Sequence, residues 1–526
     1  MALVQTCGTA VRAAVVVGII LLSTAQAIAQ TFPGGWVEKD GAGIRDRYSA
    51  AQIQGFVPSQ RGAFTFPQPY NTRAVRLTDV TDCNGGDCVW YVGYSYWRNI
   101  NAHQGSNDMF IFLGLSPQRG GGGVTLFKFN KTTEAITKVG PLFPAGSKFN
   151  SYPGDGFYFS AGSANKLYVY DGPRMLRYDI VTKQFETVFD ISAQFGGNRN
   201  IWQMHSSNDD LVHSATLQVT DTGEYLGCLV YLEATRQFRF YPKVGVFDEC
   251  NLDKSGRWTI SLENIGVPND LANRIFDNQT GQETRLNGPN GTLGHLDTGY
   301  GYVVGADNYN NLPNATILWN FENAVVQGPV VHYNANWNIA AVNHLSHTNA
   351  KPNVPLSQQY GCGSDDSTNY AAQNEITCFR MDGSQDALIV APVMTDPNAS
   401  GGCCDAYAKQ PKGNLDITGG YFLWTTNLGG NRMDAFLVKV PSHLLVNQQP
   451  LYNDGKTLTD KFGVTWTLRY TGNGDEHDVY RNGVMINGHG SDLVRSAESG
   501  FVYVKGTFGN QAWYYWQNGN WFYSWG

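Results

Sequence analysis

One pattern occurs at His205-Ser-Ser-Asn-Asp-Asp210 and again at His295-Leu-Asp-Thr-Gly299: a histidine opens a polar turn, and an apolar run follows at 211–217 and 300–304. The same pattern, led by His, Asn or Tyr, recurs along the chain in steps of 49, 53, 46, 44, 49 and 70 residues. Such a period indicates one structural unit built several times. The leading residues are, in order, His103, Tyr152, His205, Asn251, His295, His344 and Asn414.

The sequence between these turns is typical of short antiparallel strands. Runs rich in Val, Ile, Tyr, Phe and Thr, such as 166–171 and 175–179, alternate with Gly, Asn, Asp and Pro. A period near 40 to 50 residues with about four strands suits a β-propeller blade, which buries its faces only against its neighbours. Seven copies predict an all-β chain with a seven-bladed β-propeller over residues 30–441. The long last step predicts an insertion at 351–410 that forms a lid or rim.

Composition excludes several classes of protein. Charged residues make up 15% of the 526 residues, aromatic residues make up 13%, and the formal net charge is −7. A disordered chain would lack the aromatic residues, and a nucleic-acid binder would carry a basic excess, so we expect no nucleic-acid partner. Residues 1–29 have the features of an export signal: Arg12, an apolar run at 13–22, and small residues around Ala27 and Ala29. We therefore expect a secreted protein, extracellular or periplasmic, that is not inserted in a membrane after cleavage.

Eight cysteines remain after removal of the signal, and an even number in an exported chain predicts disulfides. Cys83 and Cys88 flank a Gly-Gly turn and form the firmest predicted pair. Cys228 and Cys250 bracket two strand-like runs and form a second plausible pair. The last four allow three connectivities, which the sequence leaves open: Cys362, Cys378, Cys403 and Cys404.

The sequence pattern changes after residue 450, and a second, small all-β module is predicted at 451–526. Its end contains the pattern Trp-x-x-Trp-x-x-Gly-x-Trp, with Trp513, Trp516 and Trp521. The segment resembles the small β modules appended to exported bacterial polysaccharide-active proteins. Aromatic rings with polar neighbours can stack on sugars, so these tryptophans are candidate substrate-binding residues. The alternative is that they form the core of the module.

The repeats resemble those of TolB-like propellers, whose Ser-Pro-Asp-Gly turn is loosely similar to 207–209 and 253–256. The segment His344-Leu-Ser-His347, with His295 one repeat earlier, is similar to the metal site of the oligogalacturonate lyase family of propellers. The resemblance implies a divalent metal, typically manganese, held by His295, His344 and His347 with Asn343 in the place of a family Gln. Oxygen ligands would instead favour calcium.

In a propeller the leading positions of all repeats face one axial site. With this site, the resemblance to the oligogalacturonate lyase family implies a lyase that cleaves a uronate-containing polysaccharide or oligosaccharide by β-elimination. The metal, or Arg98 or Arg199, would neutralise the carboxylate, and His205 would act as the base. Either Tyr152 or His103 would protonate the leaving oxygen. The remaining leading residues would contact substrate, namely Asn251 and Asn414.

Three alternatives remain open at this stage. Asp253, Asp297 and Asp416 recur two positions after a leading residue and would suit a glycoside hydrolase, although turn formation explains them better. The leading residues could likewise serve only as turn formers. A secreted propeller that binds glycans or proteins without catalysis is the third reading. The sequence does not indicate an oligomeric state.

Overall fold

The computed structural model describes residues 34–39, 43, 45–90, 93–101, 106–151, 156–264, 273–286, 293–307, 312, 315–322, 326–333, 344–365, 374–402, 406–446, 456–470, 477–496, 499–506 and 512–524. The predicted export signal lies outside these ranges, as do His103, Tyr152, Asn343, Cys403 and Cys404. Within the described ranges, no helix has the length and apolar character needed to cross a membrane.

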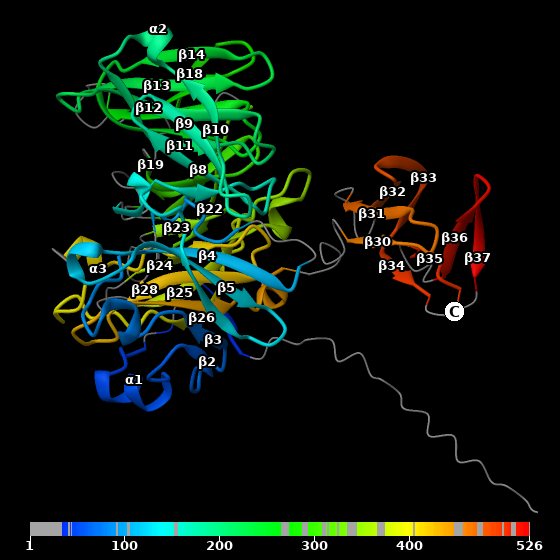
Figure 1. The fold of residues 1–526 in the computed structure, drawn as a ribbon, viewed down its shortest axis with the longest axis horizontal. Coiled ribbons are helices and arrows are strands. Elements are labelled where there is room, and N and C mark those ends of the chain that lie inside the picture. The colour runs from blue at the N-terminus through cyan, green and yellow to red at the C-terminus, as the bar shows by residue number, and fades with distance from the viewer. Residues whose placement is uncertain are drawn as a thin grey trace, which may run out of the picture. The chain divides into compact units, whose positions relative to one another are not determined.

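The described residues between 36 and 439 form seven antiparallel sheets, here called sheets 1 to 7 in chain order (Figure 1). Their strands are β4 (Asp108–Leu115), β5 (Gly123–Asn130) and β6 (Ile136–Pro141) in sheet 1; β7 (Tyr158–Phe159), β8 (Lys166–Asp171), β9 (Arg174–Asp179) and β10 (Phe185–Asp190) in sheet 2; β11 (Arg199–Ser206), β12 (Val212–Val219), β13 (Tyr225–Leu232) and β14 (Gln237–Pro242) in sheet 3; β15 (Val246–Leu252), β16 (Trp258–Asn264), β17 (Asn273–Asp277) and β18 (Glu283–Leu286) in sheet 4; β19 (Leu293–Thr298), β20 (Tyr302–Asp307), β21 (Thr316–Asn320) and β22 (Val326–His332) in sheet 5; β23 (His344–Ser346), β24 (Tyr360–Ser364), β25 (Glu375–Arg380), β26 (Asp386–Pro392) and β1 (Trp36–Lys39) in sheet 6; and β27 (Asn414–Leu415), β28 (Tyr421–Thr426), β29 (Asp434–Lys439), β3 (Arg73–Arg76) and β2 (Gly62–Thr65) in sheet 7.

Helical segments are short. The longest, α1 (Ala50–Phe56), begins with a capping box in which the Ser49 hydroxyl and the Gln52 side chain each bond the other residue's backbone N–H. The others are α2 (Ser192–Phe195), α3 (Ala406–Lys409) and the 3₁₀ turns η1 (Val80–Cys83), η2 (Pro117–Arg119), η3 (Lys148–Ser151), η4 (Leu356–Gln358) and η5 (Ser442–Leu444).

Asparagine and aspartate side chains stabilise the turns of several outer hairpins by accepting hydrogen bonds from backbone N–H groups. The carboxylate of Asp179 accepts hydrogen bonds from the backbone N–H groups of residues 181 and 182, and Asn130 accepts from 132 and 133 in the same way. Asp277 repeats the arrangement before Gly281, whose φ of 77° completes a left-handed step. The turn chemistry noted in the sequence therefore sets where neighbouring strands reverse.

Apolar clusters fill the space between every sheet and the next. For example, Phe112 and Val124 of sheet 1 pack with Phe159 and Leu167 of sheet 2. Similar clusters join sheets 2 and 3, 3 and 4, 4 and 5, 5 and 6, and 6 and 7. A seventh cluster packs sheet 7 against sheet 1, so the sheets close into a ring. This is the propeller arrangement, in which blades bury their faces only against each other.

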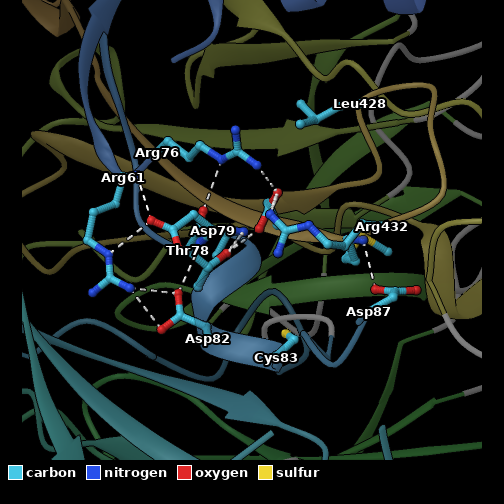
Figure 2. A network of polar contacts seen from close by, with 12 residues as sticks. Arg61, Arg76, Thr78, Asp79, Asp82, Cys83, Asp87, Leu428 and Arg432 are labelled. Carbon is cyan, nitrogen blue, oxygen red and sulfur yellow. Dashed lines mark hydrogen bonds and ion pairs between the residues drawn. The ribbon is translucent and has the colours of Figure 1, made fainter. Parts of the chain in front are cut away.

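The N-terminal strands complete the last sheet. β3 pairs with β29, with Arg76 opposite Phe436. A buried ion network fixes this junction (Figure 2): the Asp434 carboxylate accepts from Arg76 Nη2 at 2.5 Å and Thr78 Oγ1 at 2.8 Å, and it also bonds Arg432. Burial outweighs these cations and raises the pKa of Asp434 to about 6.

The structure differs from the sequence-based expectation at residues 351–410. This segment was expected to be an insertion, but it supplies β24, β25 and β26, three strands of sheet 6. Cys362 and Cys378 lie opposite each other on β24 and β25 and form a disulfide. The two pairs proposed from the sequence, Cys83–Cys88 and Cys228–Cys250, are confirmed.

Residues 456–524 form two four-stranded sheets. Their strands are β30 (Thr457–Thr459), β31 (Thr465–Tyr470), β32 (His477–Arg481) and β33 (Val484–Gly490) in one sheet, and β34 (Asp492–Arg495), β35 (Val502–Lys505), β36 (Trp513–Gln517) and β37 (Asn520–Ser524) in the other. Apolar residues of both sheets form a shared core around Trp466, Leu468 and Val504. Trp516 and Trp521 pack against this core, in agreement with the structural alternative for two of the three tryptophans.

Candidate functional site

The first strands of neighbouring sheets run next to one another: β11 beside β15, β19 beside β23, and β23 beside β27. They are the innermost strands of the ring. All five predicted leading residues in the described ranges lie on these strands. They are His205, Asn251, His295, His344 and Asn414.

Two of these histidines form an aromatic cluster. The rings of His295 and His344 stack with centroids 4.4 Å apart, and Tyr94 packs 5.8 Å from the first and 5.2 Å from the second. The half-exposed Tyr407 ring lies 6.1 Å from His344. His344 is fully buried, and neither of its ring nitrogens has a hydrogen-bond partner among the described residues. Burial lowers the pKa of His344, so the imidazole is neutral near pH 7.

His205 lies against a second pair of aromatic rings. Its centroid is 5.1 Å from that of Tyr96 and 6.1 Å from that of Trp97. Its Nε2 is buried and has no hydrogen-bond partner in the part of the chain described. Burial, followed by the nearby charges of Lys254 and Arg98, lowers the pKa of His205 to about 3. His205 is therefore neutral and keeps one buried ring nitrogen without a hydrogen-bond partner among the described residues.

A tyrosine–carboxyl pair lies beside His205. The Tyr96 hydroxyl donates to Glu249 Oε2 at 2.5 Å, and Asn251 Nδ2 donates to Glu249 Oε1 at 2.7 Å. Glu249 is 7% exposed, and burial, with a contribution from Asp248, raises its pKa to about 7. A carboxyl group with this pKa exchanges its proton near neutral pH, which is the property a general acid needs.

Two buried cations lie near His205 and lower its pKa. Arg98 donates from Nε to the carbonyl oxygen of Phe159 at 2.9 Å and forms no ion pair with a carboxylate of the described residues. Lys254 Nζ forms an ion pair with Asp297 Oδ1 at 2.7 Å. Burial lowers the pKa of both cations, because it disfavours their charged forms. An anionic group entering here would be stabilised.

Three predicted site residues are placed away from this cluster. Both ring nitrogens of His347 are occupied, Nε2 by the Tyr302 hydroxyl at 2.7 Å and Nδ1 at 2.9 Å from the Tyr360 carbonyl oxygen. Asn414 bonds the Asn99 side chain and joins sheets 7 and 1. Arg199 begins β11 and His205 is near its end, so roughly 20 Å of strand separates them.

Of the three predicted metal ligands in the described ranges, His295 and His344 lie together, whereas His347 bonds Tyr302 and Tyr360. Among the described residues, no group of three or more His, Cys, Asp or Glu side chains is placed to hold a metal ion. His295 and His344 stack face to face, and the nitrogens of His347 are used in hydrogen bonds. The described donor set therefore does not fit a divalent ion; Asn343 and His103 lie outside the described ranges.

The repeated aspartates mostly form turns, as the sequence favoured. Asp253 accepts from the backbone N–H of Trp258 at 3.0 Å, and Asp416 accepts from that of Tyr421 at 2.7 Å. Asp297 is instead the partner of Lys254. These contacts leave no facing pair of free carboxylates among the three residues.

Sequence reasoning missed several residues of the cluster, among them Tyr94, Tyr96, Glu249 and Lys254. Tyr94 and Tyr96 belong to a segment before the first repeat, and no periodicity points to them. Glu249 and Lys254 lie two positions before and three after Asn251. A signal existed for Glu249: an acidic residue two positions from a predicted site residue lies on the same face of a strand.

No protein-family model matches the sequence, and no curated protein is similar enough to it to count as a relative. Solved structures of similar shape do exist. An oligogalacturonate lyase from Vibrio parahaemolyticus has 10% identity and a TM-score of 0.51, with 74% of this chain and 98% of that chain covered. An oligogalacturonate lyase in complex with manganese has 12% identity, the same coverage and a TM-score of 0.47.

A β-propeller domain from Myceliophteria thermophila covers 67% of this chain and 99% of its own, with 9% identity and a TM-score of 0.37. At these identities a likeness in shape shows the fold alone. Together with the closed ring of sheets, it establishes that this chain contains a β-propeller.

Proposed function

We propose that this protein is an exported enzyme that cleaves a uronate-containing polysaccharide or oligosaccharide by β-elimination at the inner-strand cluster. The observation that carries the proposal is the combination of Arg98, a buried cation without a described carboxylate partner, with neutral His205 and the Tyr96–Glu249 pair. The oligogalacturonate lyase of similar fold belongs, by its name, to this class of enzyme. Three disulfides fit the oxidising compartment that export would provide.

The reaction needs a cation at the substrate carboxylate, a base at C5 and an acid at the leaving oxygen. Arg98, supported by Lys254, would bind the carboxylate and stabilise the negative charge that develops on it. The bound carboxylate would offset the charges that lower the pKa of His205. His205 Nε2 would thereby become a better base when substrate is present.

Electrons and protons then balance over one step. His205 Nε2 takes the C5 proton, the C5–H electron pair forms the C4=C5 bond, and the C4–O bond breaks. When Glu249 is protonated, its carboxyl O–H donates to the Tyr96 oxygen in place of the reverse bond, which frees the Tyr96 proton for the leaving oxygen. The Glu249 proton then moves to Tyr96. Tyr407, which is 45% exposed and lies beside His344, offers a ring face on which a sugar can stack. No step is derived through a metal, because the described donor set does not fit one.

The test is product analysis on pectic, glucuronan and gum substrates. The absorbance of the new C=C bond should rise with wild-type protein and fall about 100-fold or more in rate with His205→Ala. Arg199→Ala, on the same strand but at its other end, is the matched control and should keep the wild-type rate. New reducing ends without unsaturation would identify a hydrolase, and retention on a glycan without new ends would identify a binding protein; either result overturns the proposal.

A further inference from the structure

The two faces of the β34–β37 sheet differ in character. Side chains alternate along β36, so Trp516 faces the core while Tyr515 faces away from it. Trp516 and Trp521 pack edge to face, 5.1 Å apart, beside the core. The indole of Trp521 lies so close to Gly488 that a Cβ there would be 2.6 Å from Nε1. These two tryptophans are held in place by packing.

The opposite face carries a continuous row of rings. Centroid distances are 5.6 Å from Phe462 to Phe501, 6.0 Å from Phe501 to Tyr515 and 5.4 Å from Tyr515 to Phe522. Tyr503 adds a side contact with Tyr515 at 5.8 Å. Phe462 is 65% exposed and Phe522 is 42% exposed. We call these five residues the aromatic row.

Cations accompany the aromatic row. Lys461 Nζ lies 5.2 Å from the Phe462 centroid and 4.6 Å from the Phe501 centroid. Lys505 lies two residues after Tyr503 on β35 and therefore on the same face of the sheet. Neither lysine forms an ion pair with a carboxylate within the described ranges. Asp492, opposite Lys505 on β34, is paired with Lys456, so the row offers apolar ring faces beside an excess of lysines among the described residues.

We infer that the aromatic row binds an acidic glycan, with sugar rings stacked on Phe462, Tyr515 and Phe522 and uronate groups near Lys461 and Lys505. Stacking uses the apolar C–H faces of the sugars, and the lysines select chains that carry carboxylates. The choice of a uronate glycan rests on the proposed function, but the site itself is separate from the inner-strand cluster. It would hold a long polymer while the propeller acts on it.

The experiment uses the full mature chain and two readouts. Affinity electrophoresis in gels containing polygalacturonate or neutral dextran measures polymer binding, and turnover of short uronate oligosaccharides measures the propeller site. Tyr515→Ala/Phe522→Ala should weaken binding to polygalacturonate about tenfold or more and leave oligosaccharide turnover unchanged. Lys461→Ser/Lys505→Ser should reduce the preference for polygalacturonate over dextran. Val484→Ala, at a more exposed apolar residue on the other sheet, is the control and should change neither readout.

Unchanged polymer binding in the aromatic variant overturns the inference. A fall in the thermal stability of the propeller in that variant does so too, since it would mean that the row covers another part of this chain. If the protein cleaves nothing, the binding comparison still stands, so failure of the proposed function and failure of this inference are distinguishable.

Discussion

Replacement of Glu249 by Gln tests the acid–base assignment through stability as well as activity. In the native state burial holds the pKa of Glu249 at about 7, against an ordinary value of 4.5. One pKa unit corresponds to about 1.4 kcal/mol, so ionised Glu249 costs the folded protein about 3 kcal/mol. The amide in Glu249→Gln carries no charge and can still accept from Tyr96, while a flipped Asn251 amide accepts its N–H group.

The sign of the pH dependence follows from the raised pKa. Below pH 4.5 the carboxyl is protonated in both states, and wild type and variant should be equally stable. Between pH 4.5 and about 7 the unfolded chain releases this proton first, so the wild type loses stability relative to Glu249→Gln as pH rises. Above pH 8 the variant should be more stable by about 3 kcal/mol, or roughly 4 °C in Tm for a propeller of this length.

Thermal unfolding of both proteins from pH 5 to pH 8.5 measures this difference. Glu224→Gln is the matched control, since its side chain is 59% exposed beside Lys243 and should change stability by less than about 0.5 kcal/mol. Turnover should fall about 100-fold or more in Glu249→Gln, because the proton donor is lost. Parallel pH profiles of Tm for wild type and Glu249→Gln would refute the buried, poised carboxyl.

Two further predictions concern buried charges. Lys254→Met/Asp297→Asn removes a cation and its partner together and should raise KM for uronate substrates about tenfold or more, with little change in kcat. Asp297→Asn alone keeps the cation and should leave KM unchanged. Steady-state kinetics of both variants measures the difference. Arg76→Met should destabilise the protein by about 3 kcal/mol or more at pH 8, because the Asp434 carboxylate loses a buried partner. Since the pKa of Asp434 is about 6, that loss should shrink at pH 5, where the carboxyl is protonated, and an equal loss at both pH values would contradict the assignment.

The propeller was predictable because its repeats share turn chemistry. The leading residues of the repeats, such as His205 and His295, lie on the innermost strands, because the same position of each repeat falls on the first strand of its sheet. Strand β24 was missed because Tyr360-Gly-Cys-Gly-Ser364 has the composition of a loop. Its glycines instead allow close packing, since a Cβ at Gly361 would lie 2.9 Å from the Met381 methyl group.

The site was only partly predictable, because its chemistry comes from several distant segments. Tyr96 and Glu249 are 153 residues apart, and nothing local in the sequence couples them. His347 lies three residues after His344, yet its ring nitrogens are hydrogen-bonded to Tyr302 and Tyr360. The resemblance to the lyase family implied a shared ligand set for the two histidines, whereas packing separates their roles.

The pairing of β3 with β29 joins segments more than 350 residues apart, and this has a consequence for biosynthesis. One edge of β3 can pair with β2 at once, but its other edge must wait until β29 has been made, after nearly the whole ring. Loss of the early strand would leave the flank of β29 bare, with its backbone amides and carbonyls ready to recruit a strand from another molecule. The strand pair that closes the ring is therefore also a place where its loss would favour self-association.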